Sequence, residues 1–154
     1  MSRRLLTDAL FDTADQQLRQ RGCGFRIRRD QSRTILTFKG PVQPGAVKSR
    51  EEIETTIADQ ERGEAIIDRL GYRPWFRAEK YREEYALAST CVAIDDTPIG
   101  VFVEIEGEPA TIGTVARLLG RTERDYRLES YVQLYFDSCR AKGVLPGNMT
   151  FGIA

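Results

Sequence analysis

Residues 100–107 read Gly-Val-Phe-Val-Glu-Ile-Glu-Gly, and between the two glycines an aliphatic side chain alternates with an aromatic or acidic one. Because side chains repeat every two residues along a strand, Phe102, Glu104 and Glu106 lie on one face and three aliphatic side chains lie on the other. The two carboxylates point the same way one row apart, where like charges repel unless a cation or a basic side chain lies between them. The stretch therefore predicts a strand with a positively charged partner.

Five segments predicted as strands share one arrangement, in which a row of apolar side chains lies opposite a row of fixed charges. The charged rows contain Arg26, Arg28, Lys39, Glu52, Glu54, Lys80, Arg82, Glu104 and Glu106. An open sheet with one wet face usually carries a more mixed polar surface there. A barrel with its charges inside and its apolar rows outside, covered by helices, fits the pattern better and leaves no free edge. The predicted fold class is therefore α+β, an antiparallel β-barrel with helices packed outside.

The other elements follow from periodicity and from turn residues. Besides residues 100–107, strands are predicted at 5–13, 25–29, 34–39, 50–56, 72–87 and 89–95. The segment 72–87 is one long strand or two strands broken near Pro74, and a turn is predicted at 95–98. Helices are predicted, with Asp59 as the cap of the first, at 59–70, 112–119 and 128–142, after a short helix or turn at 14–21. The count is about seven strands.

Composition limits the classes of function. The 154 residues are 41% hydrophobic and 30% charged, which is typical of one soluble globular domain. The 23 basic and 23 acidic side chains give no net field, so an extended nucleic-acid or membrane surface is not favoured. No apolar run reaches the roughly 20 residues of a membrane span, and the first residues lack the apolar segment of a signal peptide. We therefore expect a cytoplasmic protein without nucleic-acid or membrane partners.

The sequence contains no histidine, which excludes Ser/His and Cys/His nucleophile pairs, His-ligated zinc and imidazole acid-base chemistry. Cys23, Cys91 and Cys139 are far apart, odd in number and without a Cys-x-x-Cys motif, so we expect packed, reduced thiols. Any bound metal is then expected to be a hard cation held by carboxylates, Mg²⁺ or Mn²⁺ before zinc.

An enclosed interior with both signs of charge suits a ligand that carries several negative charges together with a divalent metal. Guanidinium and ammonium groups bind phosphate oxygens, and carboxylates bind the metal. Taken singly, the Arg26/Arg28 and Glu52/Glu54 pairs are more typical of a solvated strand face, and Asp95 is more typical of a turn. The occurrence of these charged pairs in one sequence favours an enclosed interior that they share. The alternative is an open sheet with ordinary charged surfaces.

Short motifs occur in a defined order along residues 5–140: Phe11-Asp12-Thr13 followed by Leu18, Arg26-Ile27-Arg28, Thr37-Phe38-Lys39, Arg50-Glu51-Glu52-Ile53-Glu54, Lys80-Tyr81-Arg82, the Asp95/Asp96 turn and Gly100 to Glu106. In this order they resemble the CYTH domain. That family comprises the triphosphate tunnel metalloenzymes, which include class IV adenylyl cyclases and thiamine triphosphatases. The tail, Asn148-Met149-Thr150-Phe151, is similar to the ending of several bacterial class IV cyclases.

The resemblance implies an antiparallel eight-stranded tunnel that binds a small-molecule triphosphate with Mg²⁺ or Mn²⁺. The residues that match the family's triphosphate-binding positions are Arg26, Arg28, Lys39, Lys80 and Arg82. The residues that match its metal-binding carboxylates are Glu104 and Glu106 and, less closely, Glu52 and Asp95. The turn also allows Asp96 in place of Asp95.

One feature of the family is missing from the sequence. The family opens with a Glu-x-Glu-x-Lys strand followed by a helix, and this sequence begins where the family's second strand would begin. We therefore expect a single CYTH-like domain over residues 1–154, N-terminally truncated relative to the family and one strand short of closure. The strands beside the gap become free edges, which invite pairing with another chain such as a second copy in a homodimer.

Three functions are consistent with these observations. The first is metal-dependent processing of ATP, thiamine triphosphate or inorganic triphosphate, as a cyclase or as a triphosphatase; no residue is identified as the general base. The second is a nucleotide- or polyphosphate-binding module with impaired catalysis. The third treats every charged row as ordinary surface, and it predicts no binding of triphosphate.

Overall fold

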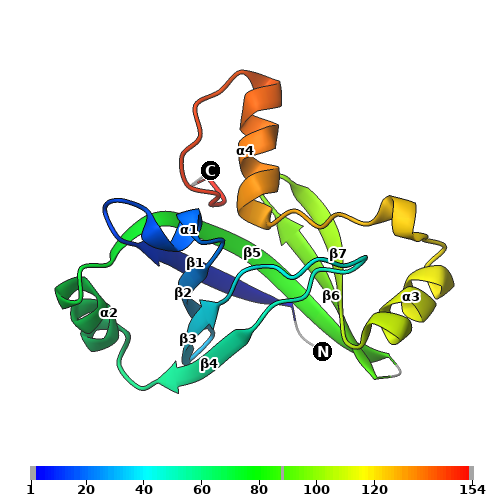
Figure 1. The fold of residues 1–154 in the computed structure, drawn as a ribbon, viewed down its shortest axis with the longest axis horizontal. Coiled ribbons are helices and arrows are strands. Elements are labelled where there is room, and N and C mark those ends of the chain that lie inside the picture. The colour runs from blue at the N-terminus through cyan, green and yellow to red at the C-terminus, as the bar shows by residue number, and fades with distance from the viewer. Residues whose placement is uncertain (1–2, 88, 153–154) are drawn as a thin grey trace.

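The computed structural model describes residues 3–87 and 89–152, and this part of the chain contains seven strands, four α-helices and one 3₁₀ helix (Figure 1). The strands are β1 (Arg4–Asp12), β2 (Gly24–Asp30), β3 (Arg33–Lys39), β4 (Glu52–Ile57), β5 (Arg73–Leu87), β6 (Thr90–Thr97) and β7 (Gly100–Glu106). The helices are α1 (Gln17–Gln20), α2 (Gln60–Arg69), α3 (Pro109–Leu118), the 3₁₀ helix η1 (Glu123–Asp125) and α4 (Tyr131–Lys142).

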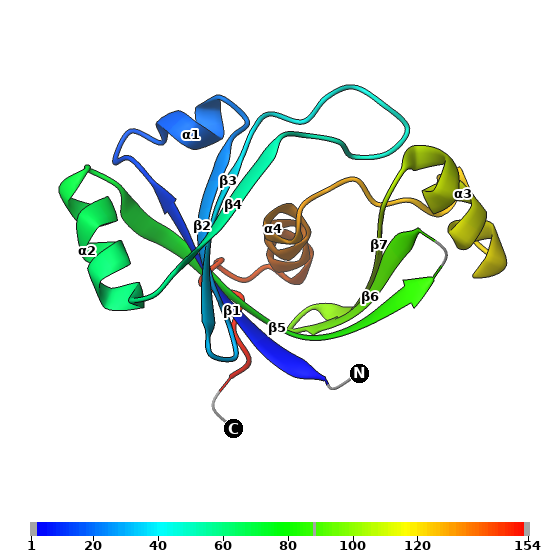
Figure 2. The same cartoon turned by 90° about the horizontal axis from the view of Figure 1, so that it is seen from below.

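All seven strands form one antiparallel sheet in the order β4-β3-β2-β1-β5-β6-β7. The strand β1 lies at its centre and pairs with β2 on one side and with β5 on the other. The sheet is strongly curved, so that β2 to β4 and β5 to β7 form the two walls of a trough (Figure 2). The antiparallel sheet and the number of strands agree with the sequence-based prediction.

The predicted barrel is not closed: within residues 3–87 and 89–152 the sheet ends at β4 and β7, and these two strands do not pair. The sequence-based count of seven strands already leaves the barrel one strand short of closure. The helix α4 lies between the two walls, on the concave side of the sheet (Figure 2). At its first residue, the hydroxyl of Tyr131 donates a hydrogen bond to Asp95 of β6. Its aromatic side chains Tyr135 and Phe136 contact Phe76 of β5. The prediction that all helices pack outside is therefore wrong for α4, whose side chains contact β5 and β6 on the concave side.

The apolar rows of β1 and β2 face the convex side, as the alternation predicted. Their core consists of Ala9, Phe11 and Ile27, and Ile67 of α2 packs against it. The helix α2 begins as predicted, because the Asp59 carboxylate accepts a hydrogen bond of 3.0 Å from the backbone N–H of Arg62. Burial of this apolar face fixes which side of the sheet carries the charges.

The chain between β5 and β7 settles one open alternative and corrects one prediction. The strand β5 is one continuous strand from Arg73 to Leu87, and its pairing with β1 shifts register near Pro74 without breaking there. The strand β6 continues to Thr97, so Asp95 and Asp96 lie in a strand and not in the predicted turn. The pairing of β6 with β7 extends to Thr97 and Gly100, which leaves only two residues for the turn.

The C-terminal segment, to which the sequence analysis assigned no structure, lies along a free edge of β5. The first half of β5 pairs only with β1, and there the backbone of Met149 forms a parallel bridge with Ala78. The N–H of Met149 donates to the carbonyl of Arg77 at 3.0 Å, and the N–H of Glu79 donates to the carbonyl of Met149 at 2.8 Å. Met149 is buried, so this segment fastens the chain that follows α4 to the sheet.

No helix within residues 3–87 and 89–152 is long and apolar enough to cross a membrane.

Candidate functional site

The charged rows predicted from the sequence lie together on the concave side of the sheet. The register places Lys39 of β3 opposite Glu52 of β4, and it places Arg82 of β5 opposite Asp95 of β6. Cross-strand neighbours point to the same face of a sheet, so these side chains meet inside the trough. The strands contribute the charges, and the curvature brings the two walls toward each other.

The most buried part of this face is a cluster around Asp95, which is completely inaccessible to solvent. Lys80 Nζ lies 2.7 Å from Asp95 Oδ2, and the guanidinium of Arg82 donates to both Asp95 oxygens at 2.6 Å. Arg82 also contacts Glu104, and Lys80 Nζ lies 3.6 Å from Glu104 Oε2. Two basic side chains are thus held between carboxylates of two neighbouring strands.

The protonation states in this cluster follow from its contacts. Burial would raise the pKa of Asp95, but the hydrogen bonds from Arg82 and Lys80 outweigh burial and hold its pKa well below the ordinary value. Burial would lower the pKa of Arg82, but its hydrogen bonds to Asp95 and the charge of Glu104 raise it. Burial and the neighbouring Arg82 lower the pKa of Lys80, against the opposing charge of Glu104. Asp95 is therefore a fixed anion that holds the two cations in place.

A second cluster centres on Asp8 of β1. The guanidinium of Arg28 donates to both of its oxygens at 2.7 Å, a bidentate geometry that fixes the side-chain plane. Arg26 Nη1 lies 3.7 Å from the same carboxylate, and Arg26 Nη2 lies 3.3 Å from Glu54 Oε1. Burial would raise the pKa of Asp8, but the hydrogen bonds and charge of Arg28 lower it.

Arg26 carries a hydrogen-bond donor that is left without an acceptor. Its Nε is buried, and in the part of the chain that the structure describes it has no hydrogen-bond partner. Burial and the nearby charge of Arg28 lower the pKa of Arg26. A buried donor without an acceptor carries a desolvation cost, which a ligand with acceptor oxygens would relieve. This atom is the clearest local indication of an anion site.

The two clusters act on each other electrostatically. The positive charge of Arg82 opposes the rise in the pKa of Arg28, and the positive charge of Lys80 helps to lower the pKa of Asp8. A third group lies toward the end of β3, where Lys39 Nζ contacts Glu52 Oε1 at 2.6 Å. All five basic residues predicted from the sequence are therefore on one face, and each is paired with a carboxylate.

The predicted metal ligands are distributed unevenly over this face. Glu104 and Glu106 both point inward from β7, and the Glu106 side chain is 66% exposed. Glu52 is paired with Lys39, and both oxygens of Asp95 accept hydrogen bonds from Lys80 and Arg82. The structure therefore places Asp95 as a partner of basic side chains, and its metal-binding role stays a prediction.

The carboxylates on this face suit a metal ion that binds together with a phosphate-bearing molecule. Within residues 3–87 and 89–152 there is no group of three or more His, Cys, Asp or Glu side chains that could hold a metal alone. Mg²⁺ is commonly bound by one or two carboxylates that share it with substrate phosphates and water. Glu104 and Glu106 share one face of β7 and can supply two carboxylates, of which Glu104 also contacts Lys80 and Arg82. The described residues form no complete protein cage.

Sequence reasoning missed Asp8 and Tyr131. The hydroxyl of Tyr131 donates to Asp95 Oδ2 at 2.8 Å, and Lys80 Nζ lies 4.7 Å from the centre of its ring. Burial, together with the charges of Glu104 and Asp95, raises the pKa of Tyr131. The sequence placed Tyr131 on an apolar helix stripe and Asp8 within a mainly apolar strand, so neither carried a signal of its own.

The fold and this face define a class of α+β proteins. In these proteins one antiparallel sheet is curved, and basic side chains paired with carboxylates line its concave side. The chain belongs to the CYTH domain family, whose family model matches residues 1–130. A protein of Methanocaldococcus jannaschii named "putative adenylate cyclase" is 32% identical over 113 residues, which are 73% of this chain and 65% of that protein. The chain thus spans less than two thirds of that relative's length.

Solved structures share the fold. One of a protein described as a "putative adenylate cyclase" from Vibrio parahaemolyticus has a TM-score of 0.74 at 18% identity, covering 86% of this chain and 80% of that one. A Pyrococcus horikoshii protein has a TM-score of 0.72 at 25% identity, covering 90% and 86%. A Hippeastrum protein, described as a "putative adenylyl cyclase" with a dominant triphosphatase activity, has a TM-score of 0.63 at 16% identity, covering 95% and 85%.

Proposed function

We propose that the concave face binds a small-molecule triphosphate as its complex with Mg²⁺ or Mn²⁺, and that the chain processes this substrate. The observation that carries the proposal is the convergence of Arg26, Arg28, Lys39, Lys80 and Arg82 on one face, with a buried Arg26 donor that lacks an acceptor. A triphosphate supplies acceptor oxygens for these donors, and the divalent metal bound with it supplies positive charge for the neighbouring carboxylates. The names of the CYTH relatives point to the same class of substrate.

Each group has a physical role in this proposal. The guanidinium groups of Arg26, Arg28 and Arg82 would donate paired hydrogen bonds to phosphate oxygens, and the two lysines would act as point charges. Glu104 and Glu106 would hold the metal, with Glu52 and Asp95 as further predicted ligands. A bound metal polarises a phosphoryl oxygen and neutralises developing charge. Asp95 and Asp8 keep Arg82 and Arg28 in position before the substrate arrives.

Two reactions fit the same face. Attack of water on the terminal phosphate makes the chain a triphosphatase, whereas attack of a ribose hydroxyl on the innermost phosphate makes it a class IV cyclase. They differ in where the nucleophile lies, and no described side chain stands out as a general base. A binding module with impaired catalysis is the alternative, favoured by the open trough and by α4 within it.

The test uses ATP, thiamine triphosphate and inorganic triphosphate, each with Mg²⁺ or Mn²⁺. Calorimetry measures binding, and phosphate, pyrophosphate and cyclic nucleotide are measured as products. Arg26→Gln should weaken binding about tenfold or more, since a hydrogen bond to a charged group contributes roughly 1.5–3 kcal/mol. Arg29→Gln is the matched control, because Arg29 lies on the same strand but on the convex side of the sheet, and its side chain is exposed.

The outcomes separate the hypotheses. Product that is lost in the Glu104→Gln/Glu106→Gln variant supports an enzyme, and saturable binding without product supports the binding module. Equal affinities of the parent and Arg26→Gln, or no binding of any triphosphate, would leave the concave face as ordinary charged surface.

A further inference from the structure

The first residue of α4 brings a hydroxyl and an aromatic ring to the charged cluster around Asp95. The Tyr131 hydroxyl donates to Asp95 Oδ2 at 2.8 Å, and Lys80 Nζ lies 4.7 Å from the centre of the ring. Phe102 of β7 packs against the same ring, edge to face, with 5.3 Å between the ring centres and 74° between the ring planes. The proposed function gives Tyr131 no role, although its side chain contacts three strands of one wall of the trough.

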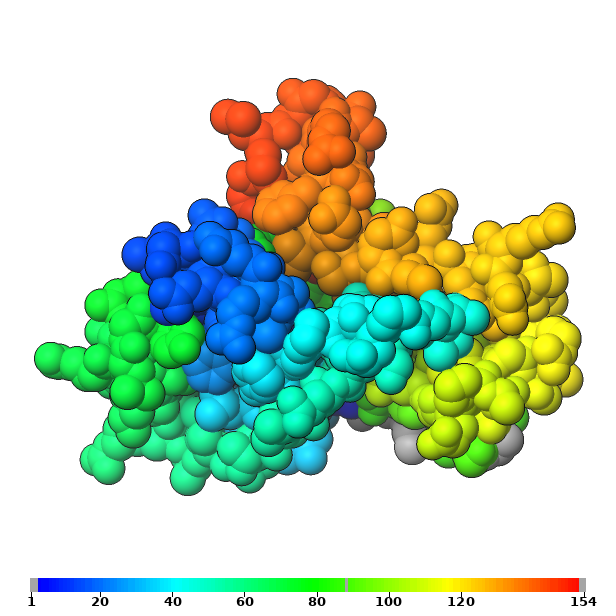
Figure 3. All heavy atoms as spheres, in the orientation of Figure 1, coloured from blue at the N-terminus to red at the C-terminus, as the bar shows by residue number. Residues whose placement is uncertain are grey.

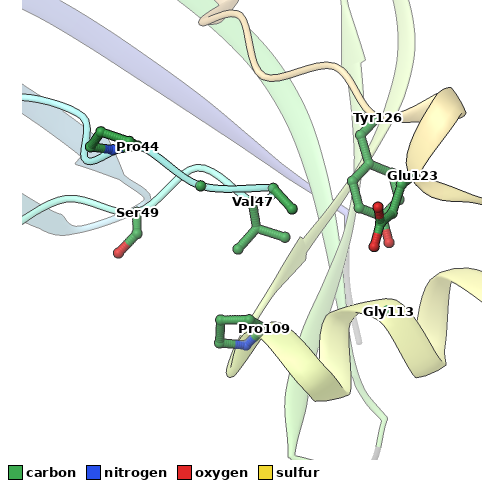
Figure 4. A pocket seen from close by; sticks show the side chains of 9 residues that line it. Pro44, Val47, Ser49, Pro109, Gly113, Glu123 and Tyr126 are labelled. Atoms are coloured by element: carbon green, nitrogen blue, oxygen red, sulfur yellow. The ribbon is translucent and has the colours of Figure 1, made fainter.

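The segment that leads into α4 is not closely packed. Figure 3 shows this segment against the loop of residues 40–51, which joins β3 to β4. A cavity of about 300 Å³ lies between the loop and the chain from α3 to η1, and Val47, Pro109 and Tyr126 are among the residues that line it (Figure 4). None of its lining residues belongs to the charged face. The position of Tyr131 is therefore set by its contacts with β5, β6 and β7.

Within the described residues the Asp95 carboxylate accepts hydrogen bonds that are divided unequally between its two oxygens. Oδ1 accepts one, from Arg82 Nε at 2.6 Å. Oδ2 accepts from Arg82 Nη2 at 2.6 Å, from Lys80 Nζ at 2.7 Å and from Tyr131 at 2.8 Å. An ionised carboxylate has about four lone-pair sites, which is roughly two for each oxygen. Oδ2 therefore has one donor more than it needs, and one of its donors can leave without making it unsatisfied.

Lys80 is the donor that can leave most easily. Arg82 is bound to both oxygens of Asp95, so its departure would break two hydrogen bonds. Lys80 gives Asp95 a single hydrogen bond, and an ammonium on a flexible stem can be redirected to another acceptor. A phosphate oxygen within reach of Lys80 can therefore replace Asp95 as its acceptor at the cost of that one bond.

The Tyr131 hydroxyl keeps Oδ2 satisfied after such an exchange. Asp95 is fully buried, so bulk water does not take the place of a lost donor. With the hydroxyl in place, Oδ2 retains two donors when Lys80 leaves. Without the hydroxyl, Oδ2 retains only Arg82, and a buried acceptor left short of donors has an energetic cost. The packing of the ring against Phe102 keeps the hydroxyl directed at Asp95 without help from Lys80.

We propose that Tyr131 is a positioning residue for triphosphate binding, whose hydroxyl holds the Asp95 carboxylate and so releases Lys80 to the phosphate oxygens. The inference rests on the proposed function, because Lys80 must contact the ligand. Helix α4 then takes part in binding, and its place inside the trough has a function.

The first experiment measures the affinity of inorganic triphosphate by calorimetry in the presence of Mg²⁺. Tyr131→Phe removes only the hydroxyl and keeps the ring, so it should weaken binding about three- to tenfold, the range of one hydrogen bond. Tyr135→Phe is the matched control and should change the affinity less than about twofold. It removes a hydroxyl from the same helix, but that hydroxyl accepts from the N–H of Gly147 and donates to the carbonyl of Asn148, away from the charged face.

A double-mutant cycle separates this role from the docking of α4. In a Lys80→Met background Asp95 has no lysine to release, so Tyr131→Phe should change the affinity less than about twofold. The other basic residues of the face keep binding measurable in this background. A loss caused by disturbed docking of α4 would persist there at full size, and that result would overturn the inference.

A crystal structure with inorganic triphosphate and Mg²⁺ tests the exchange in the parent chain, whether or not the variants fold. Lys80 should contact a phosphate oxygen while the Tyr131 hydroxyl remains on Asp95. If Lys80 stays on Asp95, or if Tyr131 turns away from it, the inference is wrong.

The failures are distinguishable. If inorganic triphosphate does not bind the parent, the proposed function fails, and the inference fails with it. If inorganic triphosphate binds but Tyr131→Phe matches the parent, or Tyr135→Phe weakens binding as much as Tyr131→Phe does, the Tyr131 hydroxyl has no positioning role and only this inference is overturned.

Discussion

Asp95 determines the geometry of two basic side chains that the proposed function needs. It is fully buried and accepts hydrogen bonds from Lys80, Arg82 and Tyr131. A fixed anion at this place orients the cations before a ligand binds, which reduces the ordering cost of binding. The same anion competes with phosphate oxygens for the same donors, so the face is arranged for a ligand with more negative charge than one carboxylate.

Replacing this carboxylate should therefore destabilise the protein strongly. Asp95→Asn leaves Arg82 and Lys80 short of a buried counter-charge, and breaking such a pair costs about 3–5 kcal/mol in free energy of unfolding. Asp96→Asn is the control next to it, because Asp96 pairs with Arg3 near the surface and exposed pairs contribute roughly 0–1 kcal/mol. Urea unfolding of both variants measures the difference. Equal midpoints for the two variants would show that Asp95 does not organise the cluster.

Alternation along strands was sufficient to predict the basic residues of the face. Arg26 and Arg28, or Lys80 and Arg82, share a face because they are two residues apart, whatever the neighbouring strands are. Asp8 was missed because its partner depends on the register between β1 and β2, which pairs it with Arg28. Tyr131 was missed because its contact with Asp95 joins a helix to a strand, and no local pattern encodes that contact.

At the scale of elements, α4 and the segment after it form one unit on the sheet. Helix α4 contacts Phe76 through Tyr135 and Phe136, and Gly143 ends it in a left-handed conformation with φ of 65°. Met149 then joins the edge of β5. Periodicity predicted this helix, but a period of 3.6 residues does not specify which side of a sheet a helix covers.

Loss of the Met149 side chain should loosen this unit. Met149→Ala removes a side chain that is only 2% exposed, and such a truncation costs about 2–5 kcal/mol in free energy of unfolding. Leu145→Ala is the matched control, since Leu145 is 95% exposed and should change stability by less than about 0.5 kcal/mol. Hydrogen exchange of the Glu79 amide, which donates to Met149, reports on the same contact. An unchanged exchange rate in Met149→Ala would contradict a docked segment.

At the scale of the whole molecule, the open sheet exposes apolar surface. Val101 and Val103 on the outer face of β7 are 66% and 54% exposed. Within residues 3–87 and 89–152, β7 pairs with β6 alone. The sequence predicted the alternation of β7 and the free edges of an unclosed sheet, but it predicted that helices would cover the outer apolar row. The pattern of one strand does not specify which face a distant helix covers.

Exposed valines beside an unpaired strand edge favour association between copies. We expect the parent chain to associate as its concentration rises, and the Val101→Lys/Val103→Lys variant to remain monomeric with a melting temperature within a few degrees of the parent. Sedimentation equilibrium over a range of concentrations measures this. Ile66→Lys, at an exposed position on α2, is the control that should still associate. A parent that stays monomeric at every concentration would contradict the expectation.

The central position of β1 also sets the route by which the chain reaches this structure. The strands β2, β3 and β4 follow one another and pair as neighbours, so they can assemble from contacts that are close in sequence. The pairing of β1 with β5, in contrast, brings together strands separated by residues 13–72. Closing so long a loop has an entropic cost before any contact compensates for it, and such non-local pairing slows folding. The two walls of the trough therefore become joined late, and the proposed binding face exists only after that step is complete.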